Sequence, residues 1–139
     1  MRPLSRVHDW PDRLDQVIAE HQAAPFVWGH YDCATLWTSA VHAMTGVDLT
    51  HDFPRWRNEL GAMRALRSRG FDSVADYVAA VLPTVPASLA GRGDLGFPED
   101  AWRGPLASPA VLMGQFGVSR DDTRWIIIPR QRLVTFFKV

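Results

Sequence analysis

The chain has 139 residues, of which 47% are hydrophobic and 22% charged, as in an ordinary soluble domain. Fifteen basic and fifteen acidic residues give a net charge of zero, which argues against binding to nucleic acid or to an anionic membrane through bulk charge. A single cysteine excludes an internal disulfide and a cysteine-rich zinc site.

Two helices are predicted in the first third of the chain. Pro11 suits the first position of a helix, and the apolar spacing over residues 14–21 gives that helix one buried face until Pro25 ends it. A second helix follows Asp32, because aspartate is a good N-cap, and Gly46 marks its end. The buried face of this second helix is expected to hold Cys33, Leu36, Trp37, Ala40, Val41 and Met44.

Two further helices are predicted before residue 83. One runs from about 57 to 69 and is closed by Gly70. The other starts at Ser73, which together with Asp76 resembles a capping box, and Pro83 ends it. The apolar residues expected to be buried on these two helices are Leu60, Met63, Leu66, Val74, Tyr77, Val78, Val81 and Leu82.

After Pro86 the sequence changes to glycine, proline and short β-prone runs. Strands are predicted at residues 94–97, 110–116, 124–128 and 134–138, with a turn at Asp121 and Asp122 and a surface loop over 98–109. The last run is expected inside the domain's own sheet, and an edge strand that pairs with a neighbouring subunit is the alternative. Helices followed by strands in one short chain predict a single α+β domain, residues 1–139, with an antiparallel sheet.

Cys33 lies in the first turn of the second predicted helix, directly after its cap. The helix N-terminus favours a thiolate there, whereas the neighbouring carboxylate of Asp32 opposes it. Trp28 and Gly29 indicate a tight turn with an aromatic wall. Cys33 therefore suits a nucleophile, but it also suits a small buried hydrophobe on the apolar face of the helix.

Three of the six tryptophans have arginines beside them. This pairing is typical of a protein–protein contact, and it is equally typical of a core tryptophan beside a solvated arginine, so the sequence leaves both interpretations open. The residues are Trp56, Trp102 and Trp125, with Arg55, Arg57, Arg103 and Arg124.

Four short segments carry a resemblance to one known family. The segments are Trp28-Gly29-His30-Tyr31-Asp32-Cys33, Thr45-Gly46-Val47-Asp48, Arg92-Gly93-Asp94-Leu95 and Phe136-Phe137-Lys138-Val139. They are similar to the NlpC-type cell-wall cysteine peptidases and, more closely, to the small NlpC-like proteins encoded among the tail genes of siphophages and gene transfer agents. The most specific part is 25–48, and the Gly-Asp-Leu match alone is weak.

The resemblance implies a papain-like NlpC-type fold, with the N-terminal helices packed on a small antiparallel C-terminal sheet. It makes Cys33 the equivalent of the nucleophile, with Trp28, Gly29 and Asp32 as candidate binding residues around it. In active members of the family a histidine opens the strand after the Gly-Asp strand. Here that position falls within 108–111, which contains no titratable base. His30, three residues before Cys33, is the remaining candidate base.

No cofactor and no metal are expected. His42 lies nine residues beyond Cys33, about 13 Å along a helix, and is too far away to act on its thiol. A metal site made of His30, Asp32 and Cys33 is disfavoured, because the three residues are closely spaced and a fourth ligand is missing.

The resemblance predicts a virion tail protein of the tail tip or baseplate, structural in role and with a degenerate peptidase site. Its partners would be other tail subunits, such as distal tail, hub or tail-fibre-like proteins, and peptidoglycan. The alternative is an active cysteine endopeptidase or amidase that cleaves peptidoglycan stem peptides during DNA delivery. An unrelated α+β domain with a buried cysteine is a third reading. Since no membrane span and no signal peptide are recognised in the sequence, synthesis in the bacterial host cytoplasm is expected.

Overall fold

The computed structural model describes residues 4–99 and 104–139. In this part of the chain, four helices are followed by six strands that form one antiparallel sheet, which confirms the predicted α+β class. The helices are α1 (Trp10–Ala23), α2 (Cys33–Thr45), α3 (Glu59–Ser68) and α4 (Val74–Val81). The strands are β1 (Thr84–Val85), β2 (Leu95–Pro98), β3 (Ala110–Leu112), β4 (Phe116–Arg120), β5 (Trp125–Pro129) and β6 (Leu133–Phe137).

Helices α1 and α2 begin and end where the sequence predicts. Pro11 lies in the first turn of α1, and the helix ends two residues before Pro25. Asp32 caps α2 through a complete capping box, in which Thr35 N donates to the Asp32 carboxylate and Asp32 N donates to the Thr35 hydroxyl. Gly46 ends α2 with a φ of +78°, a left-handed conformation that glycine adopts without strain.

Helix α3 is shorter than the predicted 57–69 and presents a different face to the core. Asn58 caps it, so the helix begins at Glu59. Leu60 was expected in the core but is 58% exposed. The apolar residues of α3 form two overlapping sets at helical spacing, and the set that contains the smaller side chains lies inward. The buried residues of α3 are Ala62, Ala65 and Leu66.

Helix α4 begins after Ser73, whose hydroxyl accepts a hydrogen bond from the backbone of Asp76. Val74 and Val78 are buried in the main core as predicted. Tyr77 is half-buried and contacts a cluster of aromatic rings from neighbouring segments. The helix therefore joins the connection between α2 and α3 to the core.

The sheet has the order β1-β6-β2-β3-β4-β5, and every adjacent pair is antiparallel. The last strand, β6, lies inside the sheet between β1 and β2, as expected. The run 110–116 is not one strand, because a turn with Gly114 at a φ of +114° separates β3 from β4. Asp121 and Asp122 connect β4 to β5, as predicted. Within the expected loop 98–109, Pro98 belongs to β2, and residues 100–103 lie outside the described part.

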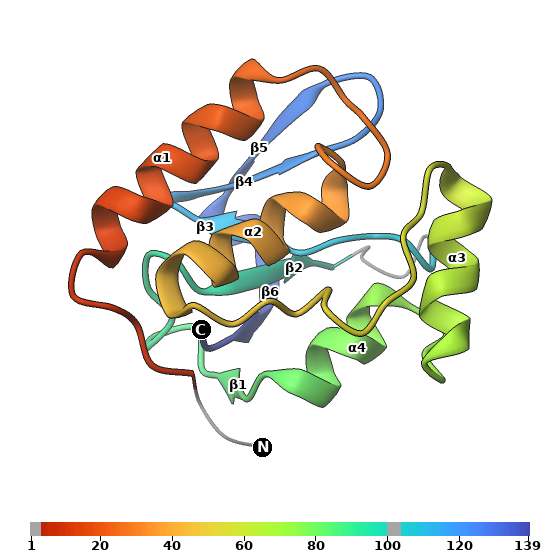
Figure 1. Cartoon of the computed structure of the whole chain (residues 1–139). Coiled ribbons are helices and arrows are strands. Elements are labelled where there is room, and N and C mark those ends of the chain that lie inside the picture. The colour runs from red at the N-terminus through yellow and green to blue at the C-terminus, as the bar shows by residue number, and fades with distance from the viewer. Residues whose placement is uncertain (1–3, 100–103) are drawn as a thin grey trace.

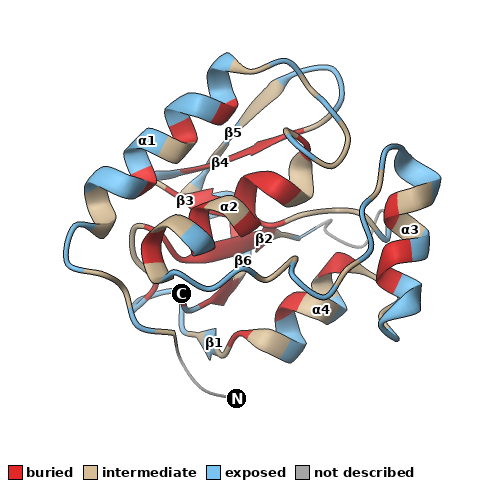
Figure 2. Ribbon diagram, in the orientation of Figure 1, coloured by how far each residue is buried: buried red, intermediate tan, exposed pale blue. Residues whose placement is uncertain are grey.

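Helices α1 and α2 lie side by side over one face of the sheet, while α3 lies at the right of the view, past the end of β2 (Figure 1). Figure 2 shows the buried residues gathered on α2 and on the central strands. Val111 of β3 contributes to the core beneath the helices, whereas its neighbours Ala110 and Leu112 belong to a smaller cluster on the opposite face. Because β3 is buried on both faces and α2 packs on it, the start of α2 is held in a fixed position.

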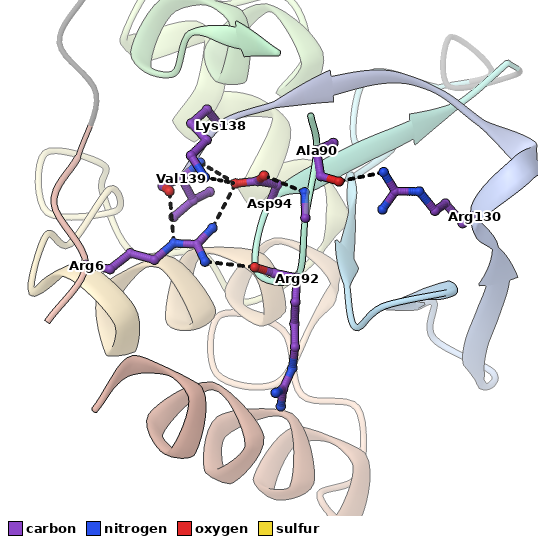
Figure 3. A network of polar contacts seen from close by, with 8 residues as sticks. Arg6, Ala90, Arg92, Asp94, Arg130, Lys138 and Val139 are labelled. Atoms are coloured by element: carbon purple, nitrogen blue, oxygen red, sulfur yellow. Dashed lines mark hydrogen bonds and ion pairs between the residues drawn. The ribbon is translucent and has the colours of Figure 1, made fainter. Parts of the chain in front are cut away.

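The Gly93-Asp94 motif has a structural role (Figure 3). The Asp94 side chain is fully buried, and its carboxylate accepts hydrogen bonds from Arg6 Nη2 at 2.8 Å, Gly91 N at 2.9 Å and Val139 N at 3.0 Å. Arg6 also donates to the Val139 carbonyl at 3.0 Å. A side chain at Gly93 would lie 2.7 Å from the Met44 sulfur. The motif therefore joins an N-terminal and a C-terminal segment to the start of β2.

Candidate functional site

Cys33 opens α2 beside a groove of about 360 Å³ that runs toward the far end of β4 and β5. The thiol donates a long hydrogen bond of 3.8 Å to the carbonyl of Leu106. Trp28 lines the groove near the cysteine, and its ring packs edge to face on Phe26 at 5.0 Å. Ser108 lines the groove as well. Cys33, Trp28 and Ser108 therefore line the same groove.

The surroundings of Cys33 favour the protonated thiol over the thiolate. Burial raises its pKa above the ordinary value, and the negative charge of Asp32 adds to this effect. Hydrogen bonds from the Ser108 hydroxyl and from the amides at the start of α2 act in the opposite direction but are the smaller influence. The helix N-terminus alone therefore does not produce an activated nucleophile, and the cysteine is a protonated thiol at neutral pH.

Asp32 holds the turn before Cys33 together from the inside. It is fully buried, and its two carboxylate oxygens accept three hydrogen bonds. Thr35 N donates at 2.8 Å, Gly29 N at 2.7 Å and Trp56 Nε1 at 2.7 Å. These donors come from α2, from the turn and from the connection to α3. Asp32 therefore positions three parts of the chain and does not line the Cys33 groove.

Gly29 is required by the same arrangement. Its φ is +81°, and a side chain at this position would lie 2.2 Å from the carbonyl oxygen of Trp56. Trp28 therefore forms part of the groove wall, and Gly29 allows the segment that contains Trp56 to pack against the turn. Of the five predicted site residues, Trp28 and Cys33 share the groove, Gly29 and Asp32 support it, and His30 lies elsewhere.

His30 and Cys33 do not share a cavity. His30 is exposed and lines a second groove on the other side of the turn, together with His51. Ser108, from the segment 108–111 in which the family resemblance locates the base, lines the same groove as Cys33. A serine hydroxyl does not accept a proton at neutral pH. Across residues 4–99 and 104–139, no histidine lines the Cys33 groove.

Arg120 is the groove residue that the sequence did not reveal. It is buried at the end of β4, and its Nη1 donates to the carbonyls of His21 at 2.8 Å and Ala24 at 3.2 Å, at the C-terminus of α1. Its guanidinium also lies 5.5 Å from the Phe26 ring centroid. The only signal in the sequence is an arginine just before the Asp121-Asp122 turn. Arg120 therefore ties α1 to the wall of the groove.

The tryptophans that have neighbouring arginines were left with two interpretations by the sequence. Trp56 is hydrogen-bonded to Asp32, and Trp125 packs against the main core, so both have partners inside the domain. Trp102 and Arg103 lie outside the described residues. Trp56 and Trp125 are only partly buried, so each packs inside the domain and keeps part of its surface exposed.

The described residues contain neither a candidate metal site nor a candidate membrane-spanning helix. Between residues 4–99 and 104–139, no group of three histidine, cysteine, aspartate or glutamate side chains is arranged to hold a metal ion. In the same ranges, no helix has both the length and the apolar character needed to cross a membrane.

Comparison with known proteins gives a family but no characterised relative. A search of curated proteins and a search of solved structures each returned no match. A family model described as a domain of unknown function matches residues 5–139. Over nearly its whole length, the chain therefore belongs to the DUF6950 family.

Proposed function

We propose that this protein is a component of a phage or phage-like tail tip or baseplate, with an NlpC-like fold whose peptidase site no longer works. The observation that carries the proposal is that Ser108 lines the Cys33 groove and that, among residues 4–99 and 104–139, no histidine does. In the family that the sequence resembles, the catalytic histidine falls within 108–111, the segment that here contains Ser108. The nucleophile position is thus retained while the base position is not.

The chemistry of the groove supports a non-catalytic role. A positioned base typically contributes about 10²–10⁴-fold to such a reaction, and the neighbouring serine cannot supply it. Burial and Asp32 also keep the thiol protonated. An unassisted, protonated thiol does not attack a peptide carbonyl at a useful rate. The groove is therefore a retained scaffold feature in this proposal.

The far edge of the sheet supports association with a neighbouring subunit. Strand β5 is an edge strand of five residues, four of which are aromatic or aliphatic. Ile127 on this strand is 61% exposed, and Phe116 on β4 is 40% exposed. An apolar edge strand is a ready template for pairing with a strand of another chain. We propose β5 as the edge at which a neighbouring tail subunit attaches.

The second candidate is an active cysteine endopeptidase or amidase that acts on peptidoglycan stem peptides. Its support is that Cys33 borders an open groove with an aromatic wall. In this case Cys33 would attack the peptide carbonyl, the C–N bond would break with release of the protonated amine, and water would then hydrolyse the thioester acyl-enzyme. The base would have to come from another chain, because the histidine nearest in sequence, His30, lines a different groove.

The proposal is tested by the protein composition of particles released by the source bacterium. Quantitative mass spectrometry of purified particles should find this chain at a fixed ratio to the other tail proteins. Particles that carry Cys33→Ala should contain the same amount and deliver DNA normally. Particles that lack the chain altogether contradict the proposal.

A further inference from the structure

The second groove, behind the Cys33 turn, has a composition suited to a ligand. It has a volume of about 450 Å³ and is formed by three segments that are separate in the sequence. His30 comes from the turn before α2, Thr35 comes from the first turn of α2, and the remaining walls come from the connection between α2 and α3. The lining holds four basic side chains, His30, His51, Arg55 and Arg57, and one carboxylate, Asp48.

The arginines are presented to the groove by the way Trp56 is held. The indole of Trp56 donates to the buried carboxylate of Asp32 at 2.7 Å, so this side chain is directed into the domain. Arg55 and Arg57, which flank it in the sequence, are both exposed and both line the groove. A buried hydrogen bond thus fixes the backbone that carries the two guanidinium groups.

The positive charge of the groove is not neutralised from within. Asp48 already accepts hydrogen bonds from Thr50 N at 2.9 Å and Thr50 Oγ1 at 2.7 Å, within its own turn. Among residues 4–99 and 104–139, neither Arg55 nor Arg57 forms an ion pair with a carboxylate. With both histidines neutral, the lining carries two positive charges and one negative charge.

The walls of the groove are formed before any ligand arrives. Phe53 packs edge to face on Tyr77 at 4.8 Å, and the Tyr77 hydroxyl donates to the carbonyl of Leu49. Thr35, on the inner wall, is buried and belongs to the capping box of α2. Because these contacts belong to the core, binding does not have to order the connection between α2 and α3.

We propose that this groove binds a small ligand with two oxyanionic groups, either phosphates or carboxylates. A guanidinium group donates two parallel hydrogen bonds to such a group, which an ammonium group cannot do. Arg55 and Arg57 each supply one such fork, and His30 and His51 supply further donors. The proposal concerns the groove behind Asp32 and does not depend on the role of Cys33.

The test is isothermal titration calorimetry of the whole chain at low ionic strength, with pyrophosphate in one series and citrate in another. Binding of pyrophosphate alone identifies a phosphate site, and binding of citrate alone identifies a carboxylate site. Binding of both supports a general oxyanion site. If neither anion binds the wild-type chain more tightly than about 1 mM, a free energy of about −4 kcal/mol, the proposal is overturned.

Substitutions in the groove test whether the anions bind there. Each of Arg55→Ala and Arg57→Ala should weaken binding about tenfold or more, because each removes hydrogen bonds between charged groups. The matched control is Arg64→Ala with Arg67→Ala, which removes two exposed arginines from α3, outside the groove. Equal losses in the control and in the Arg55→Ala, Arg57→Ala double variant contradict the site and indicate attraction by overall charge.

Discussion

Removal of the Asp32 carboxylate should destabilise the domain more than any other change to an acidic residue near the site. Asp32→Ala deletes the acceptor of three hydrogen bonds, from Thr35 N, Gly29 N and Trp56 Nε1. Loss of a helix N-cap costs about 1 kcal/mol. Each of the other two bonds, made to a charged acceptor, contributes about 1.5–3 kcal/mol. Because water can enter the space and satisfy some of the freed donors, we expect a total loss of about 3–5 kcal/mol.

The assay is urea unfolding at pH 7.5, followed by tryptophan fluorescence and by circular dichroism. Asp32→Asn should lose roughly half as much as Asp32→Ala, since an amide oxygen remains as an acceptor while the amide nitrogen does not accept. Asp122→Ala, at an exposed position in the turn before β5, is the control and should stay within about 0.5 kcal/mol of the wild type. A loss below about 1 kcal/mol for Asp32→Ala refutes the view that this carboxylate holds the turn together.

Three further predictions follow from the site and its surroundings. The rate at which iodoacetamide alkylates Cys33 should still rise above pH 9, because the pKa of the thiol is raised. His30→Ala should leave this pH profile unchanged. A rate that reaches a plateau below pH 8 would contradict the raised pKa. Ser108→His should move that profile to lower pH, since an imidazolium beside the sulfur stabilises the thiolate; an unchanged profile shows that residue 108 is not the base position. Burial lowers the pKa of His21, so the folded state keeps it neutral while the unfolded state takes up a proton. Stability should therefore fall as the pH drops from 7.5 to 5, by up to about 1.4 kcal/mol per pH unit below the unfolded-state pKa, and the pH dependence should weaken in His21→Leu. Equal slopes in the two chains exclude His21 as the cause.

The helices were largely predictable because their signals are local. Proline in the first turn, an aspartate or serine cap and a glycine stop each act within a few residues, and α1, α2 and α4 follow them closely. Helix α3 shows the limit of periodicity. Two sets of apolar residues share the helical spacing, and only packing against the rest of the domain selects the set that leaves Leu60 in solvent.

The strands were harder, because pairing decides where they end. Gly114 is the one turn-forming residue within 110–116, but a single glycine also occurs inside strands; in the structure its positive φ turns the chain and separates β3 from β4. Strand β1 has only two residues, Thr84 and Val85, and exists because β6 pairs with it. Such contacts between distant parts of the chain leave no local pattern.

The position of Cys33 was predictable from the sequence, but the contacts that hold the surrounding segments in place were not. The position of Cys33 at the start of a helix follows from the cap at Asp32. The hydrogen bond from Trp56 joins residues 24 positions apart, and the contact of Arg120 with α1 spans 96 to 99 positions. The sequence gives no reason to connect these pairs, so the buried role of Asp32 emerged only from the structure.

The most direct test of whether the Cys33 groove lacks peptidase activity is a peptidoglycan digest analysed by liquid chromatography and mass spectrometry. Purified bacterial sacculi are incubated with the wild-type chain and with Cys33→Ala. The account predicts identical fragment profiles for both, because the thiol beside Ser108 has no base. New stem-peptide fragments that appear with the wild-type chain and disappear with Cys33→Ala would contradict it and establish an active peptidase.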